Sequence, residues 1–154
     1  MFGWEFPPHI LGGLGTASYG LTKGMSKQGD MNITFVIPHP HGDEDQSFLH
    51  IIGANNVPIV WKENSWDHVN SRIGKTMHPD EYFQLRDNIR YDFRRIGTDE
   101  LGCVNFSGVY PKNLMEEISN YEAVASVVAH KGGFDIIHSH DWLTYPAGIF
   151  AKHI

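Results

Sequence analysis

The stretch Phe134-Asp135-Ile136-Ile137-His138-Ser139-His140-Asp141-Trp142 decides the fold class of this chain. Its first five residues are short and strongly apolar, and the adjacent pair Ile136 and Ile137 predicts a strand that is buried on both faces. Burial on both faces is typical of a parallel sheet covered by helices. Polar residues follow at once, so this strand is expected to end at His138.

A second stretch, Pro7-Pro8-His9-Ile10-Leu11-Gly12-Gly13-Leu14-Gly15, lies near the other end of the chain. Residues 1–6 are expected to form a first strand, which the two prolines end because neither has an N–H for a ladder. The glycines lead into a helix, with Gly29 beyond its end and a second strand at residues 31–37. The apolar residues of this helix recur at three- and four-residue steps and predict its buried face: Leu14, Ala17, Leu21 and Met25.

The last third of the chain carries two further helix signals. Asn113 is expected to cap a helix, with Glu116 completing a capping box and Gly132-Gly133 ending the helix. Thr144 is expected to cap a final helix, with Pro146 in its first turn. The longer helix has a clear apolar stripe: Leu114, Ile118, Tyr121, Ala125 and Val128.

The middle block, residues 39–112, has weaker signals. We interpret it as an elaboration within one domain that covers residues 1–154. Within it we expect strands at 57–61 and 103–107 and a helix at 79–96. Strands that alternate with helices predict an α/β fold, namely a three-layer Rossmann-like sandwich with a mostly parallel sheet. In such folds, ligands bind beyond the carboxyl ends of the strands, where both informative stretches are expected to lie.

Composition excludes several classes of protein. The 154 residues carry a net charge of −6, which argues against a broad nucleic-acid surface. No apolar run approaches ~18 residues, so no membrane span is predicted. The single cysteine, Cys103, cannot form an internal disulfide and is expected to be a buried apolar residue. A reducing, cytoplasmic setting fits this cysteine content.

The glycine turn suggests an anion site. Gly12, Gly13 and Gly15 allow the backbone to approach a phosphate at a helix N-terminus, where free N–H groups point outward. A tight turn without a ligand explains the same residues equally well. The spacing is neither G-x-G-x-x-G nor a Walker loop. The second strand ends in Ile37-Pro38 rather than an acidic residue, so NAD binding is disfavoured.

The two histidines of the late stretch are expected to point to the same face of a strand. We interpret His138 as a core residue and His140 as a ligand-contacting residue. A metal-dependent hydrolase that uses both remains an alternative, although an H-x-H-x-D-H pattern would need Asp and His where Trp142 and Leu143 stand.

Other polar residues leave their roles open. His39 and His41, with Asp43 and Asp45 nearby, are better explained by a solvated loop than by a metal site. Glu5 is expected either to face the crevice or to be a satisfied strand residue.

Both stretches together resemble the N-terminal half of a retaining GT-B glycosyltransferase of the glycogen/starch synthase group. The resemblance implies that the glycine turn approaches the diphosphate of a sugar-nucleotide donor, such as an ADP- or UDP-hexose. It also implies that His140 contacts the donor sugar and that Asp141 supports that geometry. A carbohydrate would be the acceptor, and neither a cofactor nor a metal is implied.

The resemblance has two consequences for this chain. A C-terminal nucleotide-binding domain would complete the cleft; none of it is present in these residues, so they are predicted to be inactive alone. Glycogen synthases typically carry a lysine shortly before the glycine pair, whereas this chain has His9, Ile10 and Leu11 there. A stand-alone α/β module that binds a sugar phosphate or another anion is the alternative.

Overall fold

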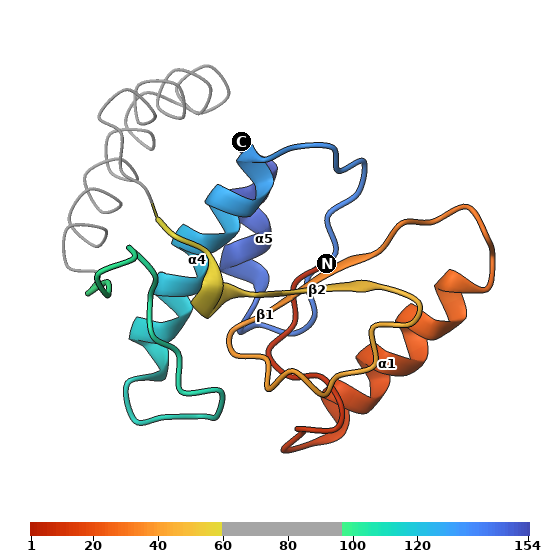
Figure 1. The fold of residues 1–154 in the computed structure, drawn as a ribbon, viewed down its shortest axis with the longest axis horizontal. Helices are drawn as coiled ribbons and strands as arrows, with labels where there is room; N and C mark the ends of the chain where they lie inside the picture. The colour runs from red at the N-terminus through yellow and green to blue at the C-terminus, as the bar shows by residue number, and fades with distance from the viewer. Residues whose placement is uncertain (60–96) are drawn as a thin grey trace.

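The computed structural model describes residues 1–59 and 97–154. The described residues form an α/β fold with a small parallel sheet and three α-helices, as expected at that level (Figure 1). The elements in chain order are α1 (Gly13–Ser26), β1 (Thr34–Ile37), β2 (His50–Gly53), a 3-10 turn η1 (Ala54–Asn56), α4 (Leu114–His130) and α5 (Tyr145–Lys152). No helix among them is both long and apolar enough to cross a bilayer.

Four segments lie side by side and run in the same direction. β1 and β2 pair in parallel, with Thr34 opposite His50. Phe2 forms single parallel bridges to Val36 of β1 on one side and to Ser139 on the other. The Phe2 N–H donates to the His138 carbonyl at 2.8 Å, and the His140 N–H donates to the Phe2 carbonyl at 3.0 Å. The lateral order is therefore residues 138–140, the N-terminal segment, β1 and β2.

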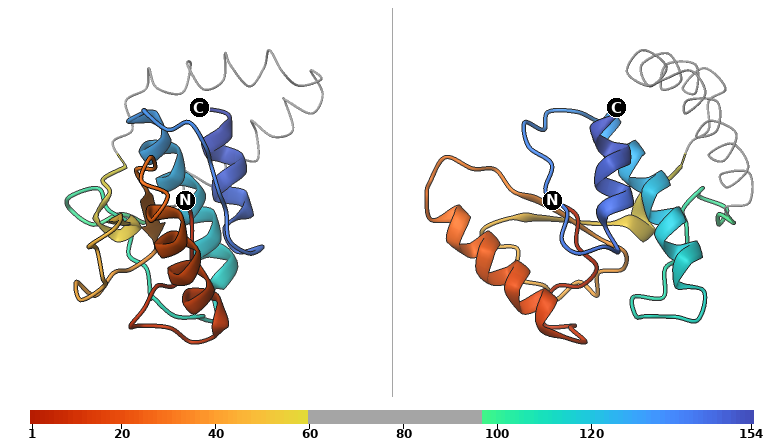
Figure 2. Two further views of the ribbon diagram at one scale, coloured as in Figure 1. Left: turned by 90° about the vertical axis from the view of Figure 1, so that its right-hand side faces the viewer. Right: turned by 180° about the vertical axis from the view of Figure 1, so that it is seen from behind.

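Two apolar clusters cover opposite faces of these segments, because side chains alternate along an extended chain. Val36 belongs to the cluster that contains residues of α4 and α5, whereas its neighbour Phe35 packs with Phe6 in the cluster that Tyr19 of α1 joins. α4 and α5 pack against each other, and α1 lies apart from them (Figures 1 and 2).

Tyr121 anchors α4 to the sheet. Its fully buried hydroxyl lies 2.7 Å from the Val36 carbonyl and 3.0 Å from the Gly3 carbonyl. Its ring meets Phe2 and Trp4 edge to face. Burial raises the pKa of this hydroxyl well above its ordinary value, so it remains a hydrogen-bond donor at any physiological pH.

Several expected strands are not formed. Residues 1–6 contribute single bridges only, and the stretch 103–107 contributes only the Val104 bridge to Thr98. Of the strand predicted at 57–61, residues 57–59 are not a strand, and residues 60 and 61 lie outside the described residues. The helix predicted at 79–96 lies outside them as well. Conversely, β2 was not anticipated, because four residues carry too little periodicity to be recognised.

The predicted burial of residues 134–138 is wrong in this structure. The segment is not a strand, and the Ile136 side chain is 82% exposed. The physical reason is its position at the edge of the sheet. Phe2 pairs with it on one side, and no described strand pairs with it on the other.

Helix positions were predicted better than helix details. α4 and α5 lie where expected, and Gly132 and Gly133 follow α4 with φ values of 79° and 84°. The capping box is absent, because the Asn113 side-chain amide donates to the Glu116 carboxylate at 3.3 Å instead of capping the helix.

The predicted apolar face of α1 is wrong at Ala17 and Leu21, which are exposed, whereas Met25 is partly buried against the cluster as expected. The buried residues of this helix are Gly15, Ser18 and Thr22, while Leu21 is exposed. The cluster that α1 joins already contains the large rings of Phe6 and Phe35, so small residues allow the helix to approach closely.

Candidate functional site

The glycine turn presents an open backbone surface. Gly12 has an extended backbone with φ −156° and precedes the first residue of α1. A Cβ added at Gly12 or Gly13 would meet nothing within 4 Å, and both residues are exposed. Within the described residues no hydrogen bond is found for the N–H groups of either glycine. These two amides are therefore available to an anion.

Glu5 lies beneath this turn. Its carboxylate is buried and accepts hydrogen bonds from the Leu11 N–H at 2.8 Å and the Gly15 N–H at 3.0 Å. Of the two roles left open for Glu5, the geometry favours a satisfied structural carboxylate. Because the Gly15 amide is already occupied, the three glycines are not equivalent as ligand donors.

The His140 ring stacks on one aromatic neighbour and contacts a second at a tilt. It lies nearly parallel to the His138 ring, with 4.3 Å between centroids, and 5.7 Å from the Phe35 ring. The two histidines therefore share a face, as alternation predicted. Burial, then His138 and the chain's amino group, lower the pKa of His140 to about 4, so its imidazole is neutral at pH 7. Its Nε2 atom is buried and has no partner among the described residues.

Asp141 adopts a left-handed backbone with φ 72°, which is unusual for a residue other than glycine. Its carboxylate accepts a hydrogen bond from the Trp142 N–H at 2.6 Å, and its carbonyl accepts one from the Thr144 N–H at 3.0 Å. Backbone strain of this kind costs on the order of 1–3 kcal/mol and concentrates at functional sites. The turn holds Asp141 directly after His140.

Tyr110 lies in the loop that precedes α4 and is sensitive to two distant carboxylates. Burial raises the pKa of its hydroxyl first, and the negative charges of Glu5 and Asp141 raise it further. The negative charges of two residues that are far apart in sequence therefore act on one phenol. The Trp4 indole N–H donates to the Val109 carbonyl at 3.3 Å and holds this loop in place. Tyr110 was not predicted from the sequence, because a lone tyrosine in a loop carries no motif.

Three imidazoles gather beside the glycine turn. His9 stacks on His41 with ring centroids 3.7 Å apart, and His41 meets His39 edge to face at 5.3 Å. His9 Nε2 lies 2.8 Å from a carboxylate oxygen of Asp43. Asp45 belongs elsewhere, since it accepts a hydrogen bond from the Tyr19 hydroxyl at 2.9 Å. This loop is solvated, as expected, and contacts among its own side chains organise it.

The histidines of this loop and the pair His138 and His140 are the two candidate metal sites that the sequence offers. In residues 1–59 and 97–154, no group of three or more His, Cys, Asp or Glu side chains is arranged to hold a metal ion.

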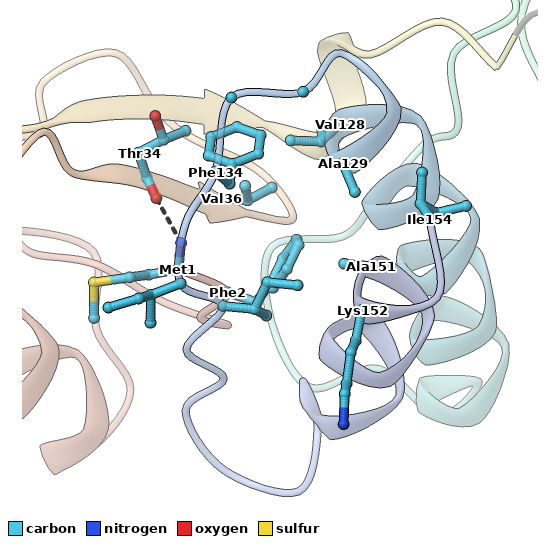
Figure 3. A pocket seen from close by; sticks show the side chains of 14 residues that line it. Met1, Phe2, Thr34, Val36, Val128, Ala129, Phe134, Ala151, Lys152 and Ile154 are labelled. Carbon is cyan, nitrogen blue, oxygen red and sulfur yellow. Dashed lines mark hydrogen bonds between the residues drawn. The ribbon is translucent and has the colours of Figure 1, made fainter. Parts of the chain in front are cut away.

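A cavity of about 240 Å³ lies beside the start of the parallel segments (Figure 3). Met1, Thr34, Phe134 and Ala151 are among its lining residues, and the Met1 amine donates to the Thr34 carbonyl. Met1 and Thr34 begin their parallel segments, whereas the glycine turn follows the end of the N-terminal segment. The cavity is therefore at the opposite end of the sheet from the glycine turn.

Comparison with known proteins identifies the class. The family model described as the starch synthase catalytic domain matches residues 1–154. The chain is therefore a glycosyltransferase. More narrowly, it belongs to the starch synthase catalytic domain family and is glycogen/starch synthase-like. Neither the curated proteins nor the solved structures gave a match.

Proposed function

We propose that this chain is the acceptor-side, N-terminal domain of a retaining GT-B glycosyltransferase that moves a hexose from a sugar nucleotide to a glucan-like acceptor. The observation that carries the proposal is the open pair of Gly12 and Gly13 amides at the start of α1, in a chain that matches a starch synthase family along its whole length. The lateral order of the four parallel segments supports a Rossmann-like, three-layer architecture.

The open amides of Gly12 and Gly13 are proposed to donate to the diphosphate of the donor. Charge develops on this diphosphate as the sugar departs, and preorganised N–H donors stabilise such charge. Gly15 is better assigned to packing, because its amide already binds Glu5. The proposed donor is an ADP- or UDP-hexose.

His140 is proposed to orient the donor sugar by hydrogen bonding. The ring is neutral at pH 7, so it offers one donor and one acceptor rather than a positive charge. Its Nε2 is unpartnered but covered, so we expect this contact to need a rearrangement when the donor binds. Asp141 then serves to hold the backbone turn that places the ring.

A second domain is proposed to complete the cleft and to bind most of the nucleotide. The match to the starch synthase catalytic domain family supports this proposal, because the glycine turn lies at the end of the sheet where ligands of α/β folds bind. The single buried thiol of Cys103 supports a cytoplasmic location.

The test is glucosyl transfer to glycogen from radiolabelled ADP-glucose and UDP-glucose by the polypeptide that carries both domains. We expect His140→Ala to lower kcat by about 100-fold or more, as loss of a positioning contact does, in a protein that remains folded at the assay temperature. Wild-type turnover in this variant would remove His140 from the site.

The isolated chain provides the complementary test. We expect it to transfer no sugar and to bind phosphate and sugar phosphates only weakly in an NMR titration. If the isolated chain bound a sugar phosphate tightly and the two-domain polypeptide transferred no sugar, a stand-alone binding module would be favoured instead.

A further inference from the structure

Glu5 ties together both ends of the glycine turn. One carboxylate oxygen, Oε2, accepts the Leu11 N–H at 2.8 Å, and the other, Oε1, accepts the Gly15 N–H at 3.0 Å. The residue is only 6% exposed, so these bonds are shielded from water. A single buried carboxylate therefore spans the segment that contains Gly12 and Gly13.

Gly15 makes this arrangement possible. A Cβ at position 15 would lie 3.2 Å from Glu5 Cγ and would overlap the Ile10 side chain. At Gly12 and Gly13 the same addition would meet open space. The glycines thus divide into one that packs on Glu5 and two that face outward.

Both side-chain oxygens of Glu5 matter for this geometry. A carboxylate accepts at both oxygens, whereas the isosteric glutamine accepts at one and would turn its NH₂ group toward another N–H donor. Bonds from backbone N–H to a carboxylate are also stronger than bonds between neutral groups. Replacing Glu5 by Gln therefore releases one end of the turn while the side-chain volume is kept.

We propose that Glu5 is a positioning residue of the donor site: its carboxylate holds the turn so that the amides of Gly12 and Gly13 face the ligand. This inference rests on the proposed function. Glu5 itself contacts no diphosphate oxygen, since both of its oxygens bind the turn and its negative charge would repel the donor.

The test compares three forms of the 154-residue chain by ¹H–¹⁵N NMR: wild type, Glu5→Gln and Glu117→Gln. Glu117 is a matched control, because it is a second buried carboxylate that accepts a backbone N–H, from Ser107 at 3.0 Å. In Glu5→Gln we expect the Gly12 and Gly13 amides to shift and to gain fast motion, while the resonances of α4 stay in place. In Glu117→Gln the glycine amides should not move.

Pyrophosphate is the probe for the second step. In wild type we expect its addition to shift the Gly12 and Gly13 amides, and in Glu5→Gln we expect about tenfold weaker binding. Unchanged order of the turn in Glu5→Gln, or equal pyrophosphate binding by both forms, would overturn the inference. A third result separates the two proposals: the turn loosens in Glu5→Gln, but the wild type does not respond to pyrophosphate. That result would contradict the proposed diphosphate site and leave the role of Glu5 in holding the turn intact.

Hydrogen exchange of the wild type keeps the inference testable if Glu5→Gln does not fold. We expect the Leu11 and Gly15 amides to exchange at least about tenfold more slowly than those of Gly12 and Gly13. Equal exchange at all four amides would mean that Glu5 does not hold the turn in solution.

Discussion

The imidazole of His140 lies in surroundings that disfavour its charged form. Burial, the neighbouring His138 ring and the amino group of the chain lower its pKa from about 6.5 to about 4. In the unfolded chain the same imidazole titrates near its ordinary value. Between these two values the unfolded chain therefore binds more protons than the folded chain.

A pH dependence of stability follows from this difference. The contribution of His140 is fully present above about pH 6.5 and is lost as the pH falls toward 4. We expect the free energy of unfolding, measured by urea denaturation, to decrease across this window, and His140→Gln to show a shallower decrease. Replacing the exposed His50 by Gln is the control. An identical slope for wild type and His140→Gln would contradict the assigned environment.

Among the helices, α1 shows how close packing depends on small residues. Gly15 is buried against Glu5 and Ile10, whereas Gly20 is exposed and a Cβ there would meet nothing within 4 Å. The two glycines therefore differ in tertiary contacts while sharing one helix.

This contrast predicts opposite effects of the same substitution. Gly20→Ala is expected to raise the free energy of unfolding by about 0.5–1 kcal/mol, because alanine loses less backbone entropy in a helix. Gly15→Ala is expected to lower it by about 1–3 kcal/mol, because the added methyl forces its neighbours to move. Urea denaturation of both variants measures the difference, and equal stability of the two would contradict the close packing of α1.

At the scale of the whole molecule, the described surface is apolar along one sheet edge. Ile136 is 82% exposed, Ile149 57% and Phe134 46%, and all three lie within residues 134–149. No segment among the described residues therefore covers this apolar edge. A contiguous apolar patch of this kind promotes association.

We therefore expect the isolated chain to self-associate through this edge. Ile136→Lys should shift the sedimentation distribution toward monomer and leave the unfolding midpoint unchanged, because the side chain is already exposed. Leu101→Lys, at a residue 78% exposed in another loop, is the control and should not change the distribution. A wild-type chain that sediments purely as monomer would contradict this prediction.

Signals confined to neighbouring residues predicted much of the fold. The apolar stripe and flanking glycines placed α4, and Thr144 with Pro146 placed the start of α5. Both succeed because helix periodicity and termination depend on interactions within a few residues. The glycine turn was recognised for the same reason, and the match to the starch synthase family agrees with the class that its motifs suggested.

The amino-acid sequence alone thus determined the α/β class, the positions of the helices and the transferase family, since each follows from local pattern or motif. Only the tertiary structure decided which side of α1 is buried and that Glu5 binds the Gly15 amide. It also decided that the charges of Glu5 and Asp141 both act on Tyr110 and raise its pKa. These contacts depend on how closely a helix approaches the sheet and on residues far apart along the chain, which no short-range pattern records.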